Sequence, residues 1–203
     1  RPEHLRTLRG IATSVGITAP LWVATGWGGA DLPDDVLPVF GGYSDSFWVA
    51  ADLERDERSL SNFQISLRRD DDSIGVDHRV SEAADPRDYD LPFATCELGS
   101  GMVAAYHRRP VVQAADVEAL GMAKLGSGSV WQGYYMFSDG RNPAPGLQES
   151  QATGAPNDFL DLSYDFGGPL AVDGSPRDSW FRLRRQHHLL TGWGSALAAM
   201  PTT

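Results

Sequence analysis

The sequence is poor in cysteine, in basic residues and in long apolar segments. Its one cysteine, Cys96, excludes an internal disulfide and any zinc cluster built from several cysteines. Lys and Arg total 17 against 27 Asp and Glu, and the resulting net charge of -10 argues against binding to a nucleic-acid backbone. No apolar run approaches the roughly 20 residues that cross a bilayer. We therefore expect neither a nucleic acid nor a membrane as a partner.

Several familiar site motifs are also missing. The Gly-Ser-Gly run at 126–128 lacks the Gly-Lys-Ser/Thr ending of a phosphate-binding loop, and no serine lies in a Gly-x-Ser-x-Gly turn. Asp70 and Asp72 resemble the start of a calcium loop, but Ile74 stands where an oxygen ligand is required. Residues 1–4 lack the apolar segment of a signal peptide, and no Asn-x-Ser/Thr site occurs. The single cysteine and the lack of Asn-x-Ser/Thr sites slightly favour a cytoplasmic bacterial protein. The alternative is a secreted protein whose signal lies before Arg1.

What is present suits a globular α/β fold. Hydrophobic residues make up 41% of the 203 residues, which is enough for a core. Apolar, β-branched and aromatic runs predict strands at 19–25, 36–40, 91–96 and 130–137. Apolar residues at helical spacing predict helices at 5–12 (with a stop at Gly16), 60–69, 116–125 and 180–190. Continuous apolar strands alternating with helices indicate a parallel sheet, in a single segment over 1–203 with a long loop at 138–176.

Glu97 is the strongest candidate for a functional residue. It comes directly after the strand predicted at 91–96 and precedes a flexible Gly-Ser-Gly turn at 99–101. In parallel α/β folds the ligand site lies at the carboxyl ends of the strands, so this position faces the site. A carboxylate there can act as a nucleophile, a general base or a metal ligand. The alternative is that Glu97 only caps the following helix.

Aromatic residues gather where the predicted strands end. Aromatic faces with polar tips suit sugars, which present C–H faces and hydroxyl edges. The alternative for the run at 130–137 is that its aromatic side chains simply fill the core. Tyr164 and Asp165 lie in the long loop, where polar groups that orient a ligand are expected. The aromatic residues at strand ends are Trp27, Tyr43, Trp48, Trp131, Tyr134, Tyr135 and Phe137.

Four segments, in the same order along the chain, resemble the glycoside hydrolase family 35 β-galactosidases. Residues 21–27 are similar to that family's Pro-Leu-Phe-Thr-Thr-x-Gly-Trp strand. Residues 97–110, which begin Glu-Leu-Gly-Ser-Gly-Met, resemble its nucleophile region. Residues 133–143 resemble its Tyr-Met-Phe/Tyr-x-Gly-Gly-Thr-Asn segment, and residues 163–170 resemble its Ser-Tyr-Asp-Tyr-x-Ala-Pro stretch. The resemblance covers nearly the whole chain.

The resemblance implies a fold, a reaction and a set of site residues. The fold is a parallel (β/α)₈ TIM barrel, and the reaction is retaining hydrolysis of terminal β-D-galactosyl residues. Glu97 is implied to be the catalytic nucleophile that forms a covalent galactosyl–enzyme intermediate. Tyr135 and Tyr164 are implied to line the galactose pocket, and the matched positions Trp27 and Asn142 to bind substrate. This chemistry needs only carboxylates and water, so we expect no metal and no organic cofactor.

Two departures from the family pattern sharpen these expectations. Where the family has Gly-Gly-Thr-Asn, this chain has Asp139-Gly140-Arg141-Asn142, which predicts a charge pair at the pocket rim. The family's Val-Glu-Asn-Glu-Tyr-Gly stretch, which holds the acid/base glutamate, does not occur. We therefore expect the second half of a barrel, about four strands with their helices, and the acid/base residue outside this chain.

A half barrel would leave two sheet edges with unpaired backbone groups. We expect it to associate with the missing half or with another copy of itself, and to be inactive as an isolated segment. Two alternatives belong to other functional classes. One is a sugar-binding module without catalysis, and the other is a fragment whose only role is to complete a barrel.

Overall fold

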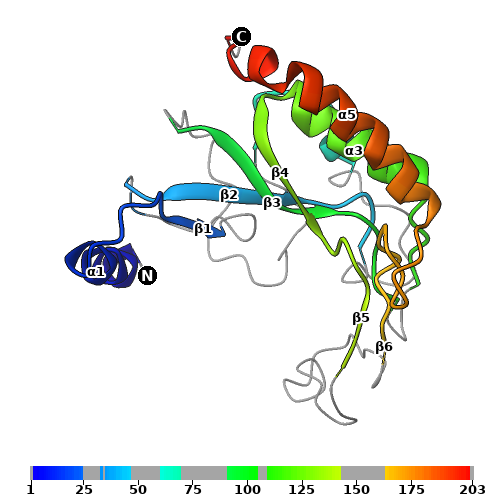
Figure 1. Cartoon of the computed structure of the whole chain (residues 1–203), viewed down its shortest axis with the longest axis horizontal. Coiled ribbons are helices and arrows are strands. Elements are labelled where there is room, and N and C mark those ends of the chain that lie inside the picture. The colour runs from blue at the N-terminus through cyan, green and yellow to red at the C-terminus, as the bar shows by residue number, and fades with distance from the viewer. Residues whose placement is uncertain are drawn as a thin grey trace.

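The structure is a computed structural model that describes residues 2–24, 33, 35–46, 60–69, 91–104, 109–142 and 163–201. Figure 1 shows the elements in chain order. They are α1 (Pro2–Ser14), β1 (Trp22–Ala24), β2 (Leu37–Gly42), η1 (Ser61–Phe63), β3 (Phe93–Gly99), α3 (Ala114–Gly126), β4 (Ser129–Tyr135), β5 (Gly140–Arg141), β6 (Ser163–Tyr164) and α5 (Asp178–Ala198). Among these residues no helix is both long and apolar enough to span a bilayer.

The main sheet is parallel and its strands follow the order of the sequence. Its order is β1-β2-β3-β4, so each strand pairs with its neighbour along the chain. The short strands β5 and β6 form a separate antiparallel pair beyond the ends of β3 and β4 (Figure 1). The prediction of an α/β fold with a four-stranded parallel sheet is confirmed.

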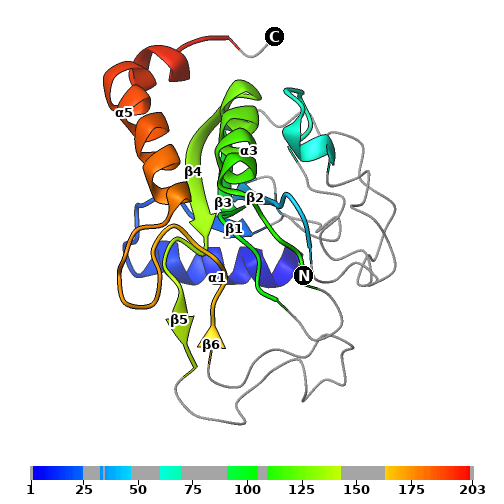
Figure 2. The same cartoon turned by 90° about the vertical axis from the view of Figure 1, so that its right-hand side faces the viewer.

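Helices α3 and α5 cover one face of this sheet, side by side (Figures 1 and 2). The start of α3 carries a capping box, in which Asp116 accepts a hydrogen bond from the Gln113 backbone N–H at 3.0 Å. Val117 and Leu120 of α3 are buried, as is Leu183 of α5. Apolar residues at helical spacing therefore form the contact between the helices and the sheet.

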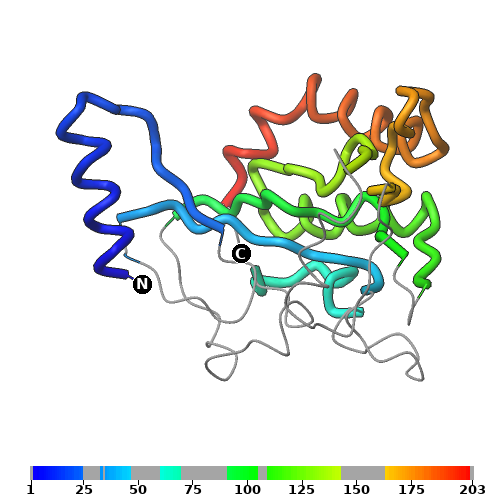
Figure 3. Tube along the Cα trace, turned by 90° about the horizontal axis from the view of Figure 1, so that it is seen from below, coloured from blue at the N-terminus to red at the C-terminus, as the bar shows by residue number. Residues whose placement is uncertain are grey.

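The opposite part of the molecule is much less covered. Helix α1 has no buried residue, and it lies apart from α3 and α5 (Figure 3). Its Arg9 makes an ion pair with Asp35 at 2.9 Å. On the sheet, the rings of Trp22 in β1 and Trp131 in β4 meet edge to face at 5.8 Å, although both side chains are about half exposed. This face of the sheet thus presents aromatic surface to solvent.

One sequence-based expectation needs correction, a second needs extension, and a third is confirmed. The helix predicted at 60–69 is wrong, because the chain there makes a single 3₁₀ turn and then leaves helical geometry. Ile65 and Leu67 are two residues apart, so a helix would point them in different directions, and both are exposed. The strand predicted at 91–96 runs on to Gly99 and includes Glu97. The helix stop at Gly16 is confirmed by its positive φ of 84°.

Candidate functional site at the ends of the strands

The centre of the site is a hydrogen bond between Glu97 and Tyr43. Glu97 lies in β3 and is half-buried, and Tyr43 comes directly after β2. The Tyr43 hydroxyl donates a hydrogen bond to Glu97 Oε1. Because β2 and β3 are parallel neighbours, their carboxyl ends lie at the same edge and bring the two side chains together.

An irregular register between β2 and β3 helps to aim Glu97. Phe40 pairs with Thr95, but the next residue of β2, Gly41, pairs with Glu97. Cys96 is therefore an extra residue in β3, which is the pattern of a β-bulge. Bulges interrupt the regular alternation of a strand and redirect the side chains that follow. The strand can thus bury Leu98 and still direct Glu97 toward Tyr43.

Burial governs the protonation of this pair. Burial raises the pKa of Glu97 above its usual value, and the hydrogen bond from Tyr43 opposes that rise. Burial, followed by the negative charge of Glu97, raises the pKa of Tyr43 well above the usual value. Tyr43 therefore stays a hydrogen-bond donor at neutral pH. Burial, with a smaller effect of Glu97, also raises the pKa of Cys96 to about 11, so that thiol stays protonated.

A second pair of hydroxyl groups lies next to the first. Tyr135 ends β4 and Tyr164 ends β6, and their hydroxyl oxygens are 2.8 Å apart. The buried ring of Phe166 connects the two pairs. Its centroid is 5.3 Å from that of Tyr135, 6.4 Å from that of Tyr164 and 6.3 Å from that of Tyr43. Glu97 thus lies at the edge of a tyrosine-rich cluster, which we call the aromatic site: Tyr43, Tyr135, Tyr164 and Phe166.

Strand β4 directs Tyr134 and Tyr135 to opposite faces of the sheet. The sequence alone left open whether either of them lines a site or fills the core. Tyr135 faces the aromatic site, whereas the Tyr134 hydroxyl lies 3.0 Å from His187 Nε2 on α5. Successive strand residues point to opposite faces, so only one of the two can reach the site. Burial raises the pKa of Tyr134 to about 12, which fits its place in the contact between sheet and helix. Both tyrosines therefore pack in the protein interior, Tyr134 between sheet and helix and Tyr135 against the buried ring of Phe166, while the Tyr135 hydroxyl meets that of Tyr164.

No family model and no curated protein matches this chain. The site must therefore be interpreted from its own geometry. Within the described residues, no group of three or more His, Cys, Asp or Glu side chains could hold a metal ion.

The remaining predicted site residues are placed less directly. Trp27 and Trp48 lie outside the described residues. Asn142 follows β5 directly, two positions beyond Gly140, which pairs with Tyr164. A role for Asn142 in substrate binding stays a prediction. Of the site residues predicted from the sequence, the structure therefore brings Glu97, Tyr135 and Tyr164 into one cluster.

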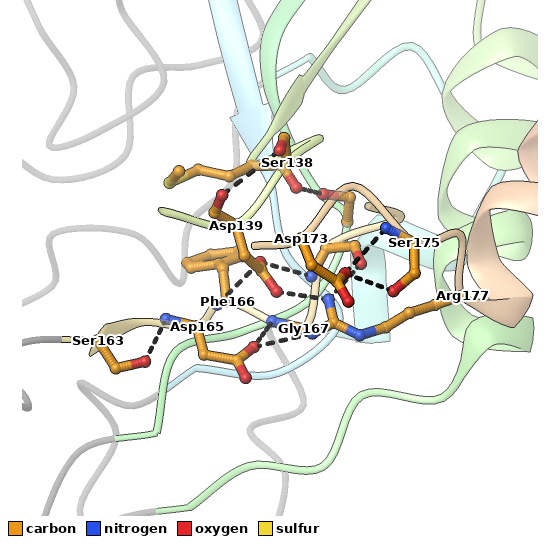
Figure 4. A network of polar contacts seen from close by, with 12 residues as sticks. Ser138, Asp139, Ser163, Asp165, Phe166, Gly167, Asp173, Ser175 and Arg177 are labelled. Atoms are coloured by element: carbon orange, nitrogen blue, oxygen red, sulfur yellow. Dashed lines mark hydrogen bonds and ion pairs between the residues drawn. The ribbon is translucent and has the colours of Figure 1, made fainter. Parts of the chain in front are cut away.

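The expected charge pair at the rim is wrong. The Asp139 carboxylate is fully buried, and its ionic partner is Arg177 at the start of α5, not Arg141 (Figure 4). Arg141 is exposed on β5. A partner 38 residues away carries no signal in the local sequence. The bond between Tyr43 and Glu97 could have been found, because both residues come at the ends of strands expected to be neighbours in a parallel sheet.

Proposed function

We propose that this chain carries the nucleophile of a retaining β-galactosidase-like glycoside hydrolase. One observation carries the proposal: a half-buried carboxylate, Glu97, is held by Tyr43 at the carboxyl edge of a parallel sheet, beside the paired hydroxyls of Tyr135 and Tyr164. A carboxylate beside aromatic rings and hydroxyl groups matches what a sugar-cleaving site needs.

The reaction assigns one role to each oxygen of Glu97. Tyr43 holds Oε1, which leaves Oε2 to attack the anomeric carbon. The C–O bond to the leaving group breaks as the ester to Glu97 forms, and an acid outside this chain protonates the departing oxygen. Water then attacks the same carbon and gives a proton to the carboxylate that served as the acid, and Glu97 is released as a carboxylate. The second carboxyl group belongs about 5 Å away, the separation that allows a covalent intermediate.

The aromatic site supplies recognition of the sugar. The buried ring of Phe166 stacks under the partly exposed ring of Tyr164 at an interplanar angle of 8°, and an exposed aromatic surface such as that of Tyr164 suits the C–H face of a pyranose. The hydroxyls of Tyr135 and Tyr164 can donate to and accept from sugar hydroxyls at the same point.

The shape of the sheet supports the finer proposal that it is the second half of a (β/α)₈ barrel. Trp22 and Trp131 lie on strands three positions apart, about 14 Å in a flat sheet at normal strand spacing. Their rings nevertheless meet at 5.8 Å, and a sheet that curves toward that face would bring them together. Curvature with sequential parallel strands is the geometry of a barrel wall. The missing half, or a second copy of this chain, would complete the wall and cover the two tryptophans.

Covalent trapping in the complete protein is the decisive test. A 2-fluoro-galactoside is expected to leave its sugar on the peptide that contains Glu97, as located by mass spectrometry. The matched Glu97→Gln variant should carry no label, and its turnover should fall by about 10³-fold or more because the attacking group is gone. Label on any other residue would contradict the assignment. The isolated 203-residue chain should not hydrolyse a nitrophenyl β-galactoside, since the family's acid/base stretch does not occur in it.

The second candidate function is sugar binding without catalysis. It is favoured by the hydroxyl pair of Tyr135 and Tyr164, which would recognise a sugar whether or not Glu97 reacts. The same Glu97→Gln variant separates the two functions. A nucleophile variant loses turnover while sugar binding is largely retained, whereas the variant of a binding module loses only affinity.

A further inference from the structure

The buried carboxylate of Asp139 has no place in the proposed reaction, yet its hydrogen bonds lead directly to the aromatic site. Its Oδ1 accepts hydrogen bonds from the backbone N–H groups of Phe166 and Gly168, both at 3.0 Å. Its Oδ2 accepts a hydrogen bond from the Arg177 guanidinium (Figure 4). One side chain, four residues beyond the end of β4, thus binds the backbone of the segment that carries Phe166.

Arg177 also binds the segment that carries Phe166, at residues 165–169. Besides its contact with Asp139, Nη1 donates to the Gly168 carbonyl at 2.7 Å, and Nη2 lies 3.3 Å from Asp165 Oδ1. The Arg177 backbone N–H donates to the Pro169 carbonyl at 2.9 Å. A planar guanidinium that bonds several groups fixes their relative orientation, because its donors diverge at set angles. We call this arrangement of Asp139, Arg177 and residues 165–169 the latch.

The segment in the latch approaches the ends of β3 and β4 very closely. A Cβ atom at Gly168 would lie 2.4 Å from the Met136 carbonyl oxygen, and one at Gly101 would lie 2.1 Å from the Phe166 carbonyl oxygen. No side chain fits at either position. The backbone around Phe166 is thus pressed against the strand ends as well as hydrogen-bonded to Asp139.

The geometry points to Asp139 and Arg177 as positioning residues for the aromatic site. They fix the backbone of Phe166, whose ring contacts Tyr43, Tyr135 and Tyr164. Tyr164 lies two residues before Phe166 and stacks on its ring, so the latch sets where the Tyr164 hydroxyl meets Tyr135. Through these contacts the latch controls the affinity of the site for a galactoside. That last consequence rests on the proposed function, whereas the positioning of Tyr164 does not.

A role in positioning explains why a charge is buried here. Burying a carboxylate costs free energy, and an apolar residue would fill the space without that cost. A carboxylate with three directed donors, however, is satisfied in only one arrangement of the surrounding backbone. Asp139 thus selects one conformation of residues 165–169.

The test uses Asp139→Asn, Asp139→Ala and a matched control in the complete protein. Asparagine keeps one oxygen that can accept the two backbone hydrogen bonds. Its NH₂ group, however, would face the guanidinium of Arg177, which is also a donor, so the variant weakens the latch without leaving a cavity. The control is Asp173→Asn, because Asp173 is exposed and accepts hydrogen bonds from Ser175, two residues further along the chain. Should Asp139→Ala fail to fold, Asp139→Asn still tests the latch.

Two readouts report on the latch itself. Amide hydrogen exchange at Phe166 and Gly168 should be about 10- to 100-fold faster in Asp139→Ala, and faster to a smaller extent in Asp139→Asn. The ¹⁹F resonance of fluorotyrosine at position 164 should shift in both variants. The Asp173→Asn control should change neither. Unchanged exchange, or an unchanged resonance of residue 164 in both Asp139 variants, would overturn the proposal whether or not the protein acts on sugars.

A third readout connects the latch to the sugar. In both Asp139 variants KM for a nitrophenyl β-galactoside should rise, by about tenfold in Asp139→Ala, while kcat falls much less, because Glu97 and Tyr43 stay in place. If exchange and the resonance change but KM does not, the latch positions Tyr164 without controlling the affinity for the galactoside, and that part of the proposal is refuted. If the wild-type complete protein binds and cleaves no galactoside, the proposed function fails, and the first two readouts decide the positioning of Tyr164 alone.

Discussion

The Tyr43 hydroxyl donates a hydrogen bond to Glu97 Oε1 across the carboxyl ends of two adjacent parallel strands. Burial raises the pKa of Glu97 and so favours its protonated form, and the hydrogen bond from Tyr43 opposes that rise. A nucleophile has to be ionised to attack, so Tyr43 widens the pH range in which Glu97 is competent. Neither residue needs a loop to hold it, because each lies in or directly after a strand of the sheet.

Replacing Tyr43 with phenylalanine should raise the pKa of Glu97 further. The variant loses the hydrogen bond that stabilises the carboxylate and keeps the burial that destabilises it. The acidic limb of the kcat/KM profile of the complete protein should therefore move to higher pH. Tyr134→Phe is the matched control, because Tyr134 faces α5 and should leave the limb in place. An acidic limb that stays put or moves to lower pH in Tyr43→Phe would contradict this account.

Replacing Glu97 with glutamine should stabilise the fold at neutral pH. The pKa of Glu97 is raised in the folded state, so its contribution to stability is fully present below the unfolded pKa of about 4.3 and is lost as pH rises through the folded pKa. Glutamine keeps an acceptor for Tyr43 and has no charge to bury. The melting temperature of the variant should exceed that of the wild type at pH 7, and by less at pH 4. A variant that melts lower at pH 7 would show that the carboxylate stabilises the fold.

Replacing Gly168 with alanine should destabilise the protein by about 1–3 kcal/mol, the usual cost of overpacking. The added methyl group would collide with the backbone carbonyl of Met136, which cannot rotate away as a side chain can. Gly140→Ala is the control, since a Cβ there meets nothing within 4 Å. Urea unfolding of both variants measures the difference. Equal free energies of unfolding would show that the backbone at Gly168 packs less tightly against Met136 than the structure indicates.

Replacing Glu118 with glutamine should have only a small effect. Glu118 on α3 binds Arg182 at 2.5 Å and Arg185 at 3.1 Å on α5, and these side chains are partly exposed. Partly exposed ion pairs contribute up to about 1 kcal/mol and are screened by salt. Urea unfolding should show a loss of that size at low salt and a smaller one at 1 M NaCl. A large loss that salt does not reduce would mean that the pair acts as a buried contact.

The sequence predicts the framework of this fold better than its contacts. Short apolar and aromatic runs mark all four strands of the main sheet, because parallel strands that pack against helices are rich in apolar residues. The helix expected at 60–69 fails because Phe63, Ile65 and Leu67 are spaced for a strand rather than a helix.

The same contrast holds for the candidate site. Glu97 is predictable because a carboxylate at the end of a buried strand is chemically conspicuous. Arg177 is not, since its partner Asp139 is distant in the sequence and both residues, taken singly, suit a solvated surface. Only the folded backbone shows that Asp139 is buried against the amides of Phe166 and Gly168.

The sequential order of the strands also bears on how the protein folds. Every pair in the main sheet joins strands that are consecutive along the chain, although the segment between β2 and β3 is much longer than the other two connections. The most extensive pairing, between β3 and β4, spans one helix, α3, which forms from local contacts. Low sequence separation keeps the entropy of loop closure small and speeds folding. The pair β1–β2 and the unit β3, α3 and β4 can therefore each form locally, and the long connection between β2 and β3 closes the sheet last.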